Sequence, residues 1–280
     1  MFEMSEIRVL GGQFNAHLKG KKISSGSLGN SPHKFVWYNR THDEFSGLVK
    51  GKKMGTAKPL GRWLLVDLEP GYCLVLGEIG GKLLWHRPGE AIPDKYHLLL
   101  NFEDGDALSL KVQMWGGIEL YEKGSEMQCK YIRGMAPTPA DANFTLDYFL
   151  ALVENCVAKG PRSVKSLLTQ EQTIPGLGNS VAQDIMFKAR LHPRQELSLL
   201  SLAELKTLFK SIVNVVREVT EAGGRDDETD LFGQQGKYRR LMHSKAAGQP
   251  CPVCGNAIQK IQYLGGACYF CPSCQALRKN

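Results

Sequence analysis

Residues 251–274 read Cys-Pro-Val-Cys-Gly-Asn-Ala-Ile-Gln-Lys-Ile-Gln-Tyr-Leu-Gly-Gly-Ala-Cys-Tyr-Phe-Cys-Pro-Ser-Cys, so two Cys-x-x-Cys pairs are separated by 16 residues. Four thiolates in two such pairs match the tetrahedral coordination of structural zinc. The spacing predicts a zinc ribbon in which one structural zinc ion is held by Cys251, Cys254, Cys271 and Cys274. A pair of redox dithiols is the alternative. The nearby Cys268 is expected to be a small packed side chain.

The end of the chain is also basic. The whole protein has a net charge of +7, and its last 50 residues carry no acidic side chain and seven basic ones: Lys237, Arg239, Arg240, Lys245, Lys260, Arg278 and Lys279. Such a surface suits a polyanion such as nucleic acid, and a solvated tail that binds nothing is the alternative. On DNA, Lys237 and Arg239 would follow the backbone while the Tyr238 ring stacks on a base.

A glycine-rich turn, Ile174-Pro-Gly-Leu-Gly178-Asn179, precedes the helical run 181–189. Glycine lets the backbone approach a ligand closely, and a helix N-terminus favours an anion such as a phosphate. Asn179 would either cap this helix or donate its amide to that phosphate. A plain connection between two helices is the alternative.

The first half of the chain has a different texture. Ile7, Leu10, Phe14 and Leu18 recur at helical spacing and predict a first helix that ends near Gly20. From residue 22 to 131, short β-prone runs alternate with turn residues, which favours a sandwich or a barrel. After a linker, two stretches with helical periodicity follow at 149–157 and 202–219, and residues 223–249 read as loop.

Composition excludes several classes of protein. Hydrophobic residues make up 42% and charged residues 22% of the chain, which is typical of a globular protein. Acidic residues near the start argue against a signal peptide, and no apolar run approaches the roughly 20 residues of a membrane span. We expect an intracellular protein with no membrane partner that works as a monomer.

Several of these features together resemble the formamidopyrimidine-DNA glycosylase/endonuclease VIII family. The run 174–193 resembles the helix–two-turns–helix of that family, and the ribbon resembles its C-terminal zinc finger. The start, Met-Phe-Glu-Met-Ser-Glu, is similar to the family's Met-Pro-Glu-Leu-Pro-Glu, and residues 60–65 resemble a strand with a DNA-contacting lysine. The features keep the family's order across nearly all of the chain.

The resemblance implies an α+β fold. It consists of an N-terminal β-sandwich flanked by helices (1–133), a linker (134–141), an all-α helix–two-turns–helix domain (142–248) and the zinc ribbon (249–280).

The implied function is base-excision repair of oxidised or damaged bases in double-stranded DNA, in the bacterial cytoplasm at the nucleoid. Duplex DNA would lie between the domains, with the damaged nucleotide flipped out. In most members the N-terminal proline attacks the sugar as a nucleophile and the next glutamate moves protons.

The sequence departs from the family at the nucleophile, where Phe2 replaces the proline. Phenylalanine is too bulky for the usual removal of Met1, so the α-amine is expected one residue further out, about 3.8 Å along the chain. Met1 and Phe2 are therefore doubtful as the nucleophile, and AP lyase activity is doubtful with them. Glu3 and Glu6 are retained, and Glu3 is the first catalytic candidate; the alternative for Glu3 is an acidic helix-start residue. A non-catalytic protein that binds damaged DNA is the alternative function.

Other family positions are altered too. Arg62 stands where the family has a phosphate-binding lysine, and Gly266 stands where its finger has an arginine. The segment that fills the gap in the duplex is replaced by residues 111–116. Met114 or Trp115 would act there as an apolar wedge, and core packing is the favoured alternative for Trp115. The lesion cannot be named, because the loop 223–236 has no readable pattern.

Overall fold

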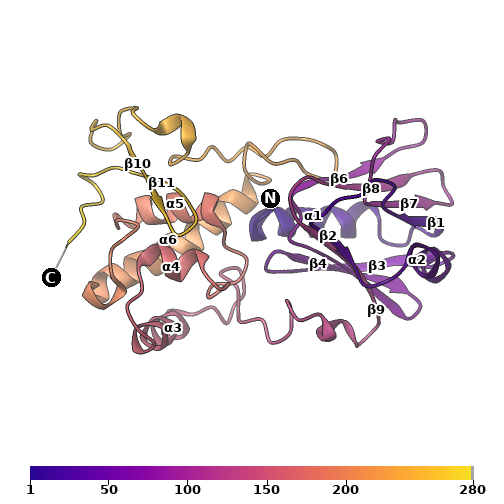
Figure 1. Cartoon of the computed structure of the whole chain (residues 1–280), viewed down its shortest axis with the longest axis horizontal. Coiled ribbons are helices and arrows are strands. Elements are labelled where there is room, and N and C mark those ends of the chain that lie inside the picture. The colour runs from indigo at the N-terminus through magenta and orange to yellow at the C-terminus, as the bar shows by residue number, and fades with distance from the viewer. Residues whose placement is uncertain (279–280) are drawn as a thin grey trace. The chain divides into compact units, whose positions relative to one another are not determined.

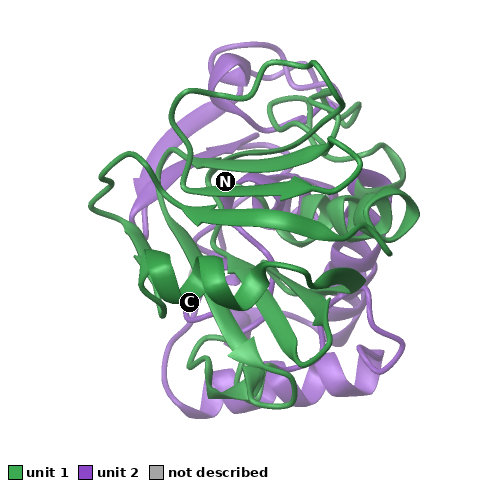
Figure 2. Ribbon diagram, turned by 90° about the vertical axis from the view of Figure 1, so that its right-hand side faces the viewer, with its two compact units in different colours: residues 1–135, 220–238 green, residues 136–219, 239–280 purple. Residues whose placement is uncertain are grey.

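The structure is a computed structural model that describes residues 1–278, so Lys279 lies outside the described residues. The chain forms two compact units (Figure 2). The first unit contains Met1–Met135 and Thr220–Tyr238, and the second contains Ala136–Val219 and the chain from Arg239 onward. The sequence predicted one continuous helical domain over 142–248, whereas residues 220–238 here fold with the N-terminal unit.

The first unit is built from two sheets (Figure 1). One has the order β1 (Ile23–Leu28), β7 (Leu98–Phe102), β8 (Ala107–Val112) and β6 (Gly81–His86). The other has the order β2 (Val36–Tyr38), β9 (Gly116–Glu122), β5 (Tyr72–Gly77), β4 (Trp63–Glu69) and β3 (Lys53–Leu60). All neighbours pair antiparallel except β2 and β9. The predicted sandwich is confirmed.

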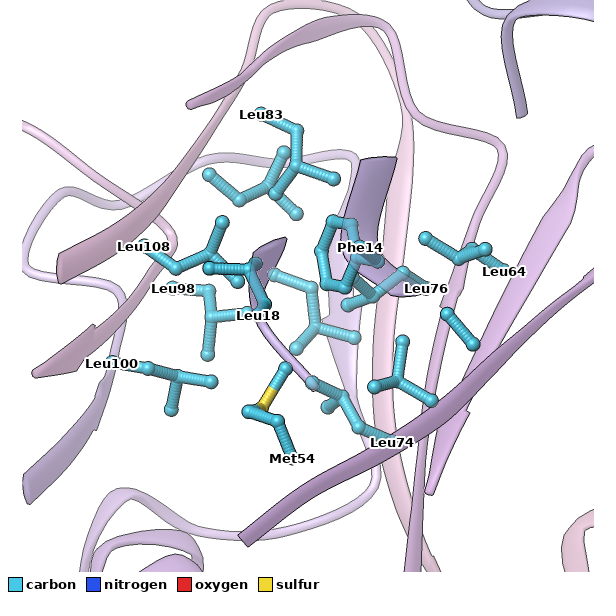
Figure 3. Packing of buried hydrophobic residues seen from close by; sticks show 14 of the residues in the cluster. Phe14, Leu18, Met54, Leu64, Leu74, Leu76, Leu83, Leu98, Leu100 and Leu108 are labelled. Atoms are coloured by element: carbon cyan, nitrogen blue, oxygen red, sulfur yellow. The ribbon is translucent and has the colours of Figure 1, made fainter. Parts of the chain in front are cut away.

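The core of this unit joins both sheets to one helix (Figure 3). The helix α1 (Met4–His17) begins at Glu3 with a capping box, in which Glu3 and Glu6 each accept from the other's backbone N–H. Its apolar side pairs Phe14 and the following Leu18 with leucines of both sheets. The second helix, α2 (His42–Val49), starts at Thr41 with another capping box. The first helix, which the spacing of apolar residues predicted, is confirmed as α1.

Four residues on adjacent strands of the five-stranded sheet are register partners and form a row across it. They are Trp37 on β2, Gly117 on β9, Gly77 on β5 and Trp63 on β4. A Cβ atom on Gly77 would lie 1.9 Å from the Trp63 ring, and one on Gly117 would lie 2.7 Å from the Trp37 ring. Each indole therefore lies directly over a neighbouring glycine, where no other residue would leave room for it. We call this row the tryptophan–glycine row.

The second unit contains α3 (Leu146–Ala158), α4 (Val164–Thr169), α5 (Asn179–Lys188) and α6 (Leu202–Glu221), which reaches Glu221 across the unit boundary. The hairpin β10 (Gln259–Tyr263) and β11 (Gly266–Phe270) lies between the two cysteine pairs. The short 3-10 turns η2 (Leu197–Leu199) and η3 (Ser244–Ala246) also belong to this unit, whereas η1 (Glu126–Gln128) belongs to the first. The helical stretches expected at 149–157 and 202–219 are confirmed. Within residues 1–278, no helix combines the length and apolar character of a membrane span.

The tryptophan–glycine row predicts opposite effects for two Gly→Ala substitutions. Gly77→Ala should lower the free energy of unfolding by about 1–3 kcal/mol, because the new methyl group overlaps the Trp63 indole. Gly12→Ala, on the exposed side of α1 with no atom within 4 Å of the new methyl, should raise it by up to about 1 kcal/mol. Urea unfolding measures both, and equal effects would contradict this description of the row.

Candidate functional site

Phe2, at the position of the family's nucleophile, is a core residue. Its side chain is fully buried in the sandwich core, and its backbone N–H donates to the Ile79 carbonyl at 2.9 Å. A peptide nitrogen held in this way is not a free amine. The side chain and the amide both serve the fold at this position.

Met1 places the α-ammonium group beside an acid from the segment 220–238. The ammonium lies 2.6 Å from Glu228 Oε1, and the Met1 carbonyl accepts from Arg225 Nη2 at 2.8 Å. A cavity of about 150 Å³ opens there, lined by Met1, Glu228 and Met114 among others, with room for several water molecules at about 30 Å³ each. The loop 223–236 thus contributes to a cavity at the start of the chain.

Arg225 joins the two candidate carboxylates. Its side chain is 2% exposed; Nε lies 2.9 Å from Glu6 Oε1, Nη2 lies 3.2 Å from Glu6 Oε2, and Nη1 lies 3.7 Å from Glu3 Oε1. The Arg225 backbone N–H also donates to Glu6 at 3.0 Å. Burial opposes the charge on Arg225, but Glu6 and then Glu3 outweigh it and raise the pKa of the guanidinium. Arg225 remains a cation at every working pH.

These groups form what we call the Arg225 cluster: Met1, Glu3, Glu6, Arg225 and Glu228. It brings three carboxylates and two cationic groups together in a largely buried place. Glu6 is fully engaged as the partner of Arg225 and of the helix cap, whereas the guanidinium stands further from Glu3. A buried carboxylate in this position can take a proton from water or deliver one to a sugar. Sequence reasoning missed Arg225, although it is the single basic residue between Gly223 and Gly236.

In the first unit, the residues expected to contact DNA differ in how far they are exposed to solvent. Arg62 is 14% exposed and pairs with Glu78 at 2.9 Å; burial raises the pKa of Glu78 although Arg62 opposes this. Lys237 is exposed, but Tyr238 is only 9% exposed. The expectation of an open Tyr238 ring for stacking is therefore corrected, because most of that ring is covered.

Exposed apolar side chains gather where the wedge was expected. Met114 is 55% exposed and Trp115 is 46% exposed, and the Trp115 ring lies 4.4 Å from that of Phe35, itself 41% exposed. Core packing was the favoured alternative for Trp115 and is wrong. Large apolar side chains left in solvent in this way point to a ligand or partner.

In the second unit, the turn before α5 is tied to the ribbon. The helix cap is Gly178, so the expectation that Asn179 caps the helix is wrong: Asn179 is the first helical residue, and its amide donates to the Ala267 carbonyl at 3.2 Å. Lys165, which is 1% exposed and was missed, donates to the Tyr263 carbonyl at 2.6 Å. Both side chains hold the β10–β11 hairpin. Arg239 is exposed.

The four predicted cysteines come together. Their sulfur atoms all lie within 4.8 Å of one another, with Cys251 and Cys274 at 3.9 Å and Cys254 and Cys271 at 3.4 Å. A tetrahedral zinc with Zn–S bonds of about 2.3 Å requires sulfur separations of about 3.8 Å. Backbone N–H groups of Val253 and Cys274 point at the first sulfur of each pair. The cluster therefore fits a metal ion, and the buried Cys268 is a packed side chain as expected.

Comparisons with known proteins identify the relatives of this chain. The model of the formamidopyrimidine-DNA glycosylase N-terminal domain matches residues 1–115, and that of the H2TH domain matches residues 135–229. Formamidopyrimidine-DNA glycosylase of Listeria innocua is 30% identical, covering 98% of this chain and all of the relative; that of Bacillus cereus is 29% identical, covering 82% and 84%.

Solved structures establish the fold independently. Lactococcus lactis Fpg in complex with DNA containing an abasic site has a TM-score of 0.84, with 22% identity and coverage of 98% of this chain and 99% of that one. MutM in complex with DNA containing carbocyclic 8-oxo-G has the same TM-score and coverage, at 23% identity.

The Arg225 cluster predicts a large stability effect. Arg225→Met should lower the free energy of unfolding by about 3–5 kcal/mol, because it leaves Glu3 and Glu6 buried without their cation. Lys50→Met, at an exposed lysine of the same unit, should change it by less than about 0.5 kcal/mol. Denaturant titration compares the two variants. A value for Arg225→Met near that of the Lys50 control would show that the cluster does not support the fold.

Proposed function

The chain belongs to the formamidopyrimidine-DNA glycosylase family, and on that premise we propose that it is a base-excision repair glycosylase acting on oxidised or damaged bases in duplex DNA. The observation that carries this proposal is Glu3. This carboxylate is 4% exposed, stands in register with the family's glutamate, and lies beside a buried arginine at the start of the chain.

We propose that the reaction is a hydrolysis. Glu3 takes a proton from water, the water oxygen forms a bond to the sugar carbon, and the bond from that carbon to the damaged base breaks. The base leaves with the bonding electrons and takes up the proton that Glu3 accepted from the water, which returns Glu3 to its carboxylate form. Glu6 and Arg225 act as positioning residues, since their bonds to each other fix the start of α1.

Lyase chemistry has less support in this chain. The Phe2 nitrogen is a hydrogen-bonded amide, and the Met1 ammonium is paired with Glu228. A Schiff base would require Met1 to lose a proton and leave that partner. The same observation favours the second candidate function, a non-catalytic protein that binds damaged DNA on the same scaffold.

The proposed DNA contacts combine charge and shape. Arg62, Lys237 and Arg239 supply cations, and the α5 N-terminus at Gly178 and Asn179 supplies backbone N–H groups. Met114 and Trp115 are proposed to enter the gap left by the flipped nucleotide, which their exposure supports. Tyr238 is left out of these proposed contacts, because its side chain is mostly buried and its backbone N–H and carbonyl are bonded to Gly224 and Asp226.

We further propose that the cysteine cluster holds one structural zinc ion. With all four positions filled by sulfur, zinc would fix the ribbon and take no part in the reaction. The named relatives are bacterial proteins, and we place this protein's work in a bacterial cytoplasm, at the chromosome, as a monomer.

The decisive assay uses duplexes with an oxidised purine, an oxidised pyrimidine or an abasic site. We expect base release without borohydride trapping, and Glu3→Gln should slow it by about 10²–10⁴-fold. The control Glu44→Gln changes a carboxylate in the same way at the start of α2 and should leave the rate unchanged. A trapped adduct would instead assign the reaction to an amine, and binding without products would favour the non-catalytic function.

Metal analysis tests the ribbon. Freshly purified, reduced protein should contain about one zinc per chain, and Cys271→Ser should lower this content and expose the ribbon to protease. Cys268→Ser, at the packed cysteine next to the cluster, should retain the zinc. Absence of metal from the unmodified protein would contradict the assignment.

A further inference from the structure

A second feature of the first unit lies on the tryptophan–glycine row. The two indoles that cover Gly77 and Gly117 approach each other, with their ring centres 6.4 Å apart. The Tyr131 ring stacks on the Trp63 ring, with ring centres 5.5 Å apart and an angle of 17° between the ring planes. The centres of the Tyr131 and Trp37 rings are 5.7 Å apart. The result is a group of three aromatic rings packed over two glycines.

This group of rings borders a cavity of about 520 Å³, which is within the usual range of small-molecule sites. Its lining includes Trp37, Tyr121 and Tyr131, with Gln128 and Lys130 at exposed positions. All of these residues belong to the first unit, and none of them belongs to the Arg225 cluster.

A buried acid lies within this lining. Glu119 is 6% exposed and accepts hydrogen bonds from Trp37 Nε1 at 2.7 Å and from the Tyr121 hydroxyl. Burial, and next the bond to Glu119, raise the pKa of Tyr121, so the hydroxyl remains a donor. Among residues 1–278, no lysine or arginine nitrogen comes within ion-pair distance of Glu119. A buried carboxylate without a cation is costly, and a cationic ligand would remove that cost.

The group of rings already attracts a cation from the chain itself. Lys130 places its Nζ 4.8 Å from the centre of the Tyr131 ring. Such contacts between an ammonium group and an aromatic face are the basis of recognition of alkylated ammonium groups. A negatively charged ligand such as a nucleotide phosphate is disfavoured here by the charge of Glu119.

We propose that this cavity is a binding site for an organic cation, either an alkylammonium or a guanidinium group. The cation would rest against Trp37 and Tyr131, pair with Glu119, and displace the Lys130 ammonium. The ligand is a small free cation or a methylated lysine or arginine side chain of another protein; the chemistry is shared.

Calorimetric titration of the full chain distinguishes these sources. The probes are choline, a peptide with trimethyl-lysine, arginine methylamide, and 3,3-dimethylbutanol, which has the shape of choline without its charge. At least one cation should bind at least about tenfold more tightly than the neutral alcohol. Tighter binding of the peptide than of choline assigns the site to a protein partner, and the reverse assigns it to a free cation.

Three variants test the residues. Glu119→Gln should weaken cation binding by about tenfold, whereas Glu122→Gln, an exposed acid on the same strand, should leave it unchanged. Lys130→Met, at an exposed position, should tighten binding because the competing ammonium is gone. Equal binding of the neutral alcohol, binding of guanosine monophosphate in preference to cations, no binding of any cation, or no tightening in Lys130→Met would overturn the proposal.

Discussion

The structure of the first unit depends on a buried arginine that must have carboxylates around it. Arg225 lies in a segment that follows α6, more than 200 residues from Glu3 and Glu6, yet it is 2% exposed and bonds to Glu6 through both its side chain and its backbone. A desolvated guanidinium is stable only where such partners are fixed. These bonds therefore fix the segment 220–238 against the start of α1. As a result, Met1, Glu3 and Glu228 lie close together.

The second constraint is at Phe2. A side chain buried in the sandwich core and a backbone N–H bonded to Ile79 give this position a structural task. The family's proline position has lost its reactive group here, while the adjacent glutamate remains. In the reaction that we propose, chemistry at this end of the chain passes through Glu3 and water; the other route is through the Met1 amine after it leaves Glu228. The Arg225 cluster favours the first route because it holds Glu3 by the cap of α1 and by a nearby cation.

Much of the fold could be predicted from local signals. The spacing of Ile7, Leu10 and Phe14 marks a helix, and the cysteine spacing marks the ribbon, because both patterns depend on residues close in sequence. Arg225, Glu119 and Lys165 could not be found in this way, since their partners lie on distant segments. The exposure of Trp115 and the burial of Tyr238 were wrongly predicted for the same reason. Residue type indicates only a preference for a buried or an exposed position, whereas tertiary packing determines the position that the side chain takes. The Gly77–Gly117 pair was visible only once strand register was known.

The central claim is that Glu3 acts on a flipped sugar in a protein without the family's terminal proline. The most direct measurement is a crystal structure of the Glu3→Gln protein with a duplex that carries a tetrahydrofuran abasic analogue. We predict that the analogue is everted and that the substituted side chain at position 3 lies within about 3.5 Å of the sugar or of a water molecule that contacts it. An analogue that remains stacked in the duplex, or one that is everted far from position 3, would contradict the account.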